Sequence, residues 1–144
     1  MYIGESLRRA PIVTVPFVVS MFTLVLALVN TGATSEISRF LTAGESIIKC
    51  GVSSFLCSNF INNIPMSVLF SALVGENIGA VYASVIGSNL GAFLTPVGAL
   101  AGIMWTGMLK NHGVKLSFAR FSLYGIAISI PALLAALAGL CIIL

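Results

Sequence analysis

Long apolar stretches, separated by short polar ones, dominate the pattern of hydrophobic and polar positions along the chain. A helix needs about 20 apolar residues to cross a hydrocarbon core of about 30 Å, and the first and last stretches are long enough to do so as single spans. Each of the two stretches between them is interrupted by amide, hydroxyl, glycine and proline residues. The pattern predicts four elements: a span over residues 12–31, a hairpin over 40–74, a discontinuous span over 78–109 and a final span over 118–144.

The two interrupted stretches have different expected shapes. The polar tip of the first, at residues 58–65, leaves two arms that are each too short to cross at about 1.5 Å per residue, which predicts a re-entrant helical hairpin. The second predicts one transmembrane helix that is broken at residues 87–96. Non-helical backbone at membrane depth persists only where it packs against protein or lines a cavity. Paired interruptions of this kind are typical of the binding site of a membrane carrier.

Composition supports a membrane protein. Hydrophobic residues make up 58% of the chain and charged residues 8%, against about 45–50% and about 25% in soluble domains. The net charge of +3 comes mainly from basic residues in two short segments and not from a basic face, so it concerns membrane orientation and indicates no nucleic-acid partner. We predict an all-α, multi-pass protein that is embedded in the lipid bilayer of the plasma membrane.

The basic residues also predict an orientation. Arg8 and Arg9 precede the first span, and Lys110 and Lys115 lie before the last one. A hairpin that returns to the side it entered from places both clusters on one side, which the positive-inside rule assigns to the cytoplasm. We therefore expect a cytoplasmic N-terminus and a hairpin that enters from outside, although two complete short spans in its place would give the same parity.

The two interruptions supply the candidate binding residues. Their amides and hydroxyls donate and accept hydrogen bonds without carrying charge, so they can ligate a small oxyacid or a cation. Pro65 suits the first turn of the second arm, whose N-terminal dipole would face the tip. Two alternatives stay open: the amides satisfy the backbone of the turn, and the glycines serve close helix packing. The candidate substrate- or ion-binding residues are Ser58, Asn59, Asn62, Asn63, Pro65, Gly87, Ser88, Asn89, Thr95, Pro96 and Gly98.

The remaining polar residues have more ordinary interpretations. Glu45 and Lys49 lie four positions apart in the favourable order, which predicts an ion pair, with Glu45 as a proton carrier as the alternative. Cys50 and Cys57 would lie about 10 Å apart along a helix, too far to hold one atom together, and we expect buried thiols and no metal site. The sequence contains no metalloprotease motif, paired carboxylates or Ser/His arrangement, so we expect no enzyme.

Several of these segments resemble the arsenite/antimonite efflux permeases. The resemblance lies in AVYASVIGSNLG at residues 80–91, in LTPVGALA at residues 94–101 followed by Trp105, and in the tip Asn62-Asn63-Ile64-Pro65, which is similar to that family's Asn-Asn-hydrophobe-Pro hairpin. The family belongs to an ion transporter superfamily that includes sodium/proton antiporters and citrate or dicarboxylate carriers. The resemblance extends over nearly the entire chain.

The resemblance implies an elevator-like secondary transporter built from two inverted repeats, each with one re-entrant hairpin and one interrupted helix. This chain would be the C-terminal repeat. Its partner would be the missing N-terminal repeat or a homologous chain, and a homo-oligomer is a further alternative. By analogy Asn62, Asn63, Asn89, Thr95 and Gly98 would flank the sites of the substrate and of a coupling ion, H+ or Na+, with no other cofactor. Many arsenite permeases carry an aspartate where this chain has Asn89, so the resemblance does not imply proton transfer through this position.

Three functions stay open from the sequence. The first is efflux of arsenite or antimonite by half of a secondary transporter. The second keeps the carrier half but changes its cargo to sodium and protons, or to citrate or another carboxylate. The third is a membrane fragment without transport activity.

Overall fold

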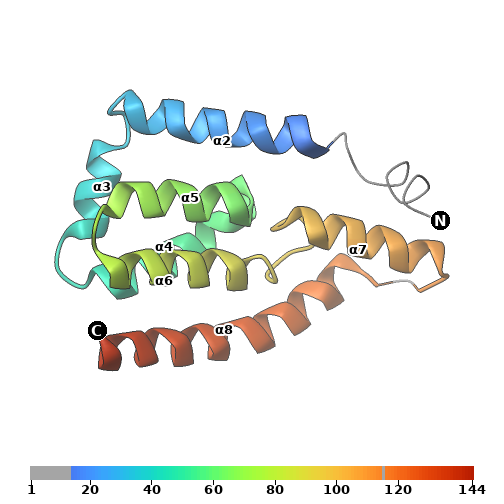
Figure 1. Ribbon diagram of the computed structural model, residues 1–144. Helices are drawn as coiled ribbons and strands as arrows, with labels where there is room; N and C mark the ends of the chain where they lie inside the picture. Colours follow the sequence, from blue (N-terminus) through green and yellow to red (C-terminus); the bar gives the residue numbers. More distant parts are fainter. Residues whose placement is uncertain (1–13, 115) are drawn as a thin grey trace, which may run out of the picture.

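The computed structural model describes residues 14–114 and 116–144, and these residues form helices joined by short turns, with no strand among them (Figure 1). This arrangement agrees with the predicted all-α class. The helices are α2 (Thr14–Asn30), α3 (Ser35–Thr42), α4 (Ser46–Ile61), α5 (Asn63–Val74), α6 (Ile78–Gly91), α7 (Leu100–Asn111) and α8 (Phe118–Ile143).

The helices extend between two ends of the molecule (Figure 1). The hairpin of α4 and α5 opens at the end where α3 and the last turn of α8 lie, while α2 begins at the opposite end, where α7 ends and α8 begins. Helices α6 and α7 follow one another in the same direction, with a non-helical break between them. The Lys110 loop thus lies at the end where α2 begins; Arg8, Arg9 and Lys115 lie outside the described residues, and a cytoplasmic location for this end stays a prediction.

Among the described helices, α8 is the one that is both long and apolar enough to cross a bilayer by itself. Helices α2 and α3 meet the same criterion only as a pair, and they are bent by 84° where they join. Helices α4, α5 and α6 are apolar but have 16, 12 and 14 residues, which corresponds to lengths of only about 18–24 Å. The two hairpin arms and the first half of the discontinuous helix are therefore too short to cross singly.

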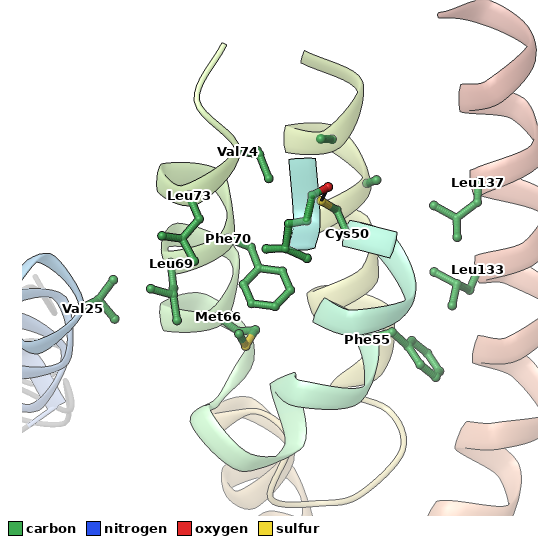
Figure 2. Close-up of a cluster of buried hydrophobic side chains, with 13 residues drawn as sticks. Val25, Cys50, Phe55, Met66, Leu69, Phe70, Leu73, Val74, Leu133 and Leu137 are labelled. Atoms are coloured by element: carbon green, nitrogen blue, oxygen red, sulfur yellow. Dashed lines mark hydrogen bonds between the residues drawn. The ribbon is translucent and has the colours of Figure 1, made fainter. Parts of the chain in front are cut away.

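Helix α5 lies at the centre of the buried apolar core (Figure 2). Its Leu69 and Leu73 point toward Val25 of α2, and Phe70 points to the other side, toward α4. Helix α8 adds Leu133 and Leu137 from the side opposite α2. The hairpin is thus packed between the first and last helices.

The hairpin differs from its predicted form in where its arms begin and how it turns. The first arm begins at Ser46 and not at residue 40, because residues 35–42 form the separate helix α3, which ends before Gly44 with its positive φ of 65°. The predicted tip at residues 58–65 is mostly helical, and Asn62 alone separates the two arms. Pro65 lies in the first turn of α5, where its missing amide donor is not needed.

The break in the discontinuous helix begins later than predicted. The sequence suggested a break from residue 87, whereas α6 continues to Gly91 and the break occupies residues 92–99. Two polar groups at the predicted break donate hydrogen bonds within the helix: Ser88 Oγ and Asn89 Nδ2 donate to the carbonyl of Val85 at 3.0 and 2.8 Å. Pro96 and Gly98 do lie in the break.

Candidate functional site

The hairpin turns at a single residue, Asn62. Its N–H donates to the carbonyl of Ser58 at 2.9 Å, and its carbonyl accepts from the N–H of Met66 at 3.1 Å. Asn62 has φ 81° and ψ 149°, and among the described residues it alone combines a side chain with a positive φ. This conformation is essentially restricted to glycine and costs other residues about 1–3 kcal/mol. The surrounding contacts must therefore hold the tip in place.

Asn59 joins the last turn of α4 to the broken helix. Its Nδ2 donates to the carbonyl of Gly91 at 2.9 Å, at the end of α6. Its Oδ1 accepts from the Thr95 hydroxyl at 2.8 Å, within the break. Both sides of the amide are thus used inside the protein, which makes Asn59 a structural link between the hairpin and the break.

Asn63 makes a second link between the same two segments. Its N–H donates to the carbonyl of Gly98 at 3.2 Å, and its Nδ2 donates to Oδ1 of Asn89 at 3.1 Å. A Cβ atom on Gly98 would lie 2.7 Å from Oδ1 of Asn59 and 3.0 Å from Ala92 backbone atoms, so Gly98 leaves room for the Asn59 link. The tip and the break, which are more than 25 positions apart in sequence, therefore form one junction.

Glycine residues bring α4 and α6 into direct backbone contact. A Cβ atom built on Gly87 would overlap the carbonyl oxygen of Gly51. One built on Gly91 would overlap the carbonyl oxygen of Phe55 and the hydroxyl of Ser58. In the structure Gly87 and Gly91 thus serve helix packing, which the sequence left as the alternative to a binding role. We refer to this contact as the glycine seam.

Glu45 and Lys49 do not form the predicted ion pair. Lys49 Nζ donates to the carbonyl of Ala43 at 2.5 Å and lies 5.1 Å from the centroid of the Phe40 ring. Glu45 is the residue before α4, and its side chain is exposed. A negative charge is favourable at this position because it lies at a helix N-terminus. Both residues lie at the open end of the hairpin, far along α4 from the tip.

Other contacts of the hairpin and the broken helix carried weaker signals in the sequence. Asn77 caps α6 by accepting from the N–H of Ala80 at 3.0 Å, and its Nδ2 donates to Ser46 Oγ at 2.9 Å. An asparagine just before an apolar run is a typical N-cap signal, so the first of these contacts could have been predicted. Gly125 of α8 lies against the break, where a Cβ atom would overlap the carbonyl of Phe93. Nothing in the sequence distinguishes Gly125 from other small residues of that helix.

The junction is polar and carries no formal charge. The N-termini of α5 and α7 and the C-termini of α4 and α6 lie at its edges, so partial charges of opposite sign meet there. Within the described residues, the side chain of Asn62 makes no hydrogen bond and Oδ1 of Asn63 accepts none. Both residues are half-buried. These unused donors and acceptors suit a small polar ligand with little net charge.

No metal-binding group of three His, Cys, Asp or Glu residues is found in residues 14–114 and 116–144. Cys50 is buried and directs its Sγ to the carbonyl of Leu41 at 3.8 Å. Cys57 is half-buried on the same helix, and Cys141 is exposed near the end of α8. All three thiols are free, and none lies among the residues of the junction.

The sequence is similar to known membrane proteins along nearly its whole length. Residues 2–144 match the family model described as arsenical pump membrane protein. The chain is 32% identical to the arsenical pump membrane protein of Escherichia coli (strain K12) over 151 residues, which covers 95% of this chain and 35% of that protein. The values for the arsenical pump membrane protein of Yersinia enterocolitica are the same.

A more distant relative has a less specific name. The 46 kDa membrane protein of Mycobacterium leprae (strain TN) is 30% identical over 144 residues, covering 88% of this chain and 33% of that protein. The chain thus spans about a third of the length of the curated relatives it matches. No solved structure matches the chain significantly.

Proposed function

The chain belongs to the arsenical pump membrane protein family, and we propose that it forms part of a membrane transporter that moves arsenite or antimonite out of the cell. The curated relatives are about three times longer than this chain, so the transporter needs further membrane segments. We propose that these come from the remainder of a longer protein or from a homologous chain, including a second copy of this one.

One observation carries the proposal: the junction between the hairpin tip and the break. Asn63 reaches Gly98 and Asn89, and Asn59 reaches Gly91 and Thr95. Non-helical backbone that meets in this way, with helix ends around it, supplies the donors and acceptors from which discontinuous transporter helices build substrate and ion sites. Loose packing in the membrane would require neither contact.

The chemistry of the junction supports a neutral oxyacid as cargo. Arsenite at neutral pH is an uncharged acid with three hydroxyl groups, each able to donate and to accept a hydrogen bond. The amides of Asn62 and Asn63 offer both functions without charge. A carboxylate anion such as citrate would favour cationic partners such as Arg or Lys, and the candidate binding residues include neither.

In the proposed mechanism the hairpin and α6 move as one body against the remaining segments, as in an elevator. The glycine seam and the Asn59 link support this rigid unit, because sliding would break both. The coupling ion is H+ or Na+. Asn89 has no titratable group, so proton coupling would require a carboxylate elsewhere in the full transporter. We place the N-terminus in the cytoplasm on the positive-inside rule.

The test replaces the matching 35% of the E. coli K12 relative with this chain and expresses the chimera in an arsenite-sensitive host. We expect growth at arsenite concentrations that stop cells with the chain alone, and accumulation of arsenite in everted membrane vesicles. Asn63→Ala should reduce both. Asn111→Ala, an exposed asparagine at the far end of α7, is the matched control and should reduce neither.

The outcome separates the alternatives. A chimera that inserts into the membrane but gives neither resistance nor arsenite accumulation would reject the proposed cargo. Sodium-dependent proton movement or citrate uptake in the same vesicles would then identify the superfamily alternative. Absence of every activity would favour a membrane fragment without transport.

A further inference from the structure

Helix α3 has an unusual position for so apolar a chain. It follows α2 after the turn at Gly32, which has φ 72°, and ends before Gly44, which has φ 65°. The axes of α2 and α3 differ by 84°. If α2 runs along the bilayer normal, α3 lies nearly parallel to the membrane surface, at the end where the hairpin opens (Figure 1).

One strip of α3 is fixed against the protein. Leu41 has no exposed surface, and Ser38 Oγ donates to the carbonyl of Leu73 at 2.7 Å, near the end of α5. Positions 38 and 41 are three apart and share one face of a helix. This strip sets the rotation of α3 about its axis and determines what its two flanks face.

The two flanks of this strip have opposite chemistry. At about 100° per residue, Ile37 and Phe40 lie on one flank and Arg39 lies on the other. Ile37 is 43% exposed and Phe40 is 56% exposed. Arg39 pairs with Glu36 at 2.9 Å, and both of these side chains are about three-quarters exposed. A helix with separate protein, apolar and charged sectors matches the three environments at a membrane interface.

Lys49 adds a cation beside the apolar flank. Its ammonium lies 5.1 Å from the centroid of the Phe40 ring and uses one donor for the carbonyl of Ala43. An ammonium has three donors, and Lys49 forms no ion pair among the described residues. A cation next to apolar surface at the level of the helix ends is the usual arrangement of a side chain that reaches lipid headgroups.

We propose that α3 lies flat in the bilayer interface at the open end of the hairpin. In this position Ile37 and Phe40 contact the upper acyl chains, Arg39 and Glu36 face water, and the Lys49 ammonium binds a phospholipid phosphate. The inference depends on the membrane location of the family and not on the cargo. A failure of arsenite transport in the chimera would leave it untouched.

Tryptophan fluorescence tests the position of α3. In the full chain with Trp105→Phe, which removes its one tryptophan, single tryptophans are introduced as Phe40→Trp, Glu36→Trp and Ile128→Trp. Each variant is reconstituted in phosphatidylcholine vesicles that contain lipids brominated at different depths. We expect bromines about 5–10 Å below the headgroups to quench Phe40→Trp most strongly. Deeper bromines should quench Ile128→Trp, which is exposed in the middle of α8, and aqueous acrylamide should quench Glu36→Trp.

Ile37→Trp gives a second measurement of the apolar flank should Phe40→Trp fail to insert. Insensitivity of both variants to every brominated lipid would overturn the proposal, because protein or water would then cover that flank.

A separate measurement of lipid preference addresses the phosphate contact. Lys49→Gln should lower the preference for phosphatidylglycerol over phosphatidylcholine about fivefold, equivalent to about 1 kcal/mol per basic residue at the surface. Lys49→Arg should keep the preference, and an unchanged preference in Lys49→Gln would exclude the phosphate contact.

Discussion

Replacing Asn59 with leucine, whose side chain has the same branching but no polar atom, should weaken the junction between the hairpin tip and the break. The substitution removes the hydrogen bond from Nδ2 to the carbonyl of Gly91, at 2.9 Å, and the one from the Thr95 hydroxyl to Oδ1, at 2.8 Å. A hydrogen bond within a protein contributes a net stabilisation of about 0.5–1.5 kcal/mol. The carbonyl of Gly91 keeps its bond from the N–H of Leu94, so it is not left unpaired. We expect the free energy of unfolding to fall by about 1–3 kcal/mol, the sum of two such bonds.

A double-mutant cycle isolates the bond within the break. Thr95→Val removes the hydroxyl and keeps the shape, so the pair Asn59→Leu and Thr95→Val should show a coupling of about 0.5–1.5 kcal/mol. The assay is unfolding of the full chain in detergent micelles by titration with sodium dodecyl sulfate, followed by circular dichroism. Asn111→Leu, at an exposed position, is the control for the change in polarity.

If Asn59→Leu changes the free energy of unfolding by no more than Asn111→Leu, within about 0.5 kcal/mol, Asn59 does not join the two segments. A coupling near zero with a destabilised single variant would mean that the loss comes from the Gly91 bond or from packing, and would remove Thr95 from the link.

Three further features can be tested by substitution. Gly87→Ala should lower the free energy of unfolding by about 1–3 kcal/mol through overpacking against the carbonyl of Gly51. Gly139→Ala, on α8 where nothing lies within 4 Å, should raise it by up to about 1 kcal/mol; thermal unfolding compares the two, and equal effects would contradict the glycine seam. Ser129→Ala should be neutral or stabilising, because the buried hydroxyl has no partner among the described residues and an unpaired buried group costs about 1–3 kcal/mol. A clear loss of stability would mean that the hydroxyl is hydrogen-bonded after all. Asn62→Gly should stabilise the chain by about 1 kcal/mol by relieving the positive φ and should lower arsenite resistance in the chimera; full resistance would exclude the Asn62 amide as a ligand of the cargo.

Polar residues that interrupt long apolar runs led the sequence to predict a turn within residues 58–65 and a break within residues 87–96, and the helices are separated at Asn62 and at residues 92–99. The sequence misplaced the start of the break because a polar cluster does not by itself end a helix. Ser88 and Asn89 return their side chains to the carbonyl of Val85, and α6 continues past them to Gly91. Only the residues from 92 onward, with Pro96 among them, leave the helix.

Other features depended on contacts between distant segments, which a single sequence does not contain. The sequence did not predict helix α3 as a separate element. Its few apolar residues are divided between a buried face and an exposed flank, so they form no long apolar run. The spacing of Glu45 and Lys49 suits an ion pair, but the loop at Gly44 brings the carbonyl of Ala43 within reach of the ammonium instead. The use of both sides of the Asn59 amide could be seen only once Thr95 was placed beside it.

The contact between Gly87, Gly91 and the carbonyls of α4 also limits how this part of the sequence can diverge. At lipid-facing positions any hydrophobic residue of moderate size satisfies the bilayer, so these positions are free to drift over generations. At the two glycines even a methyl group would meet backbone atoms, and a matching change on α4 cannot make room because a carbonyl oxygen belongs to every amino acid. Among relatives, substitutions should therefore accumulate at lipid-facing positions and be rare at Gly87 and Gly91.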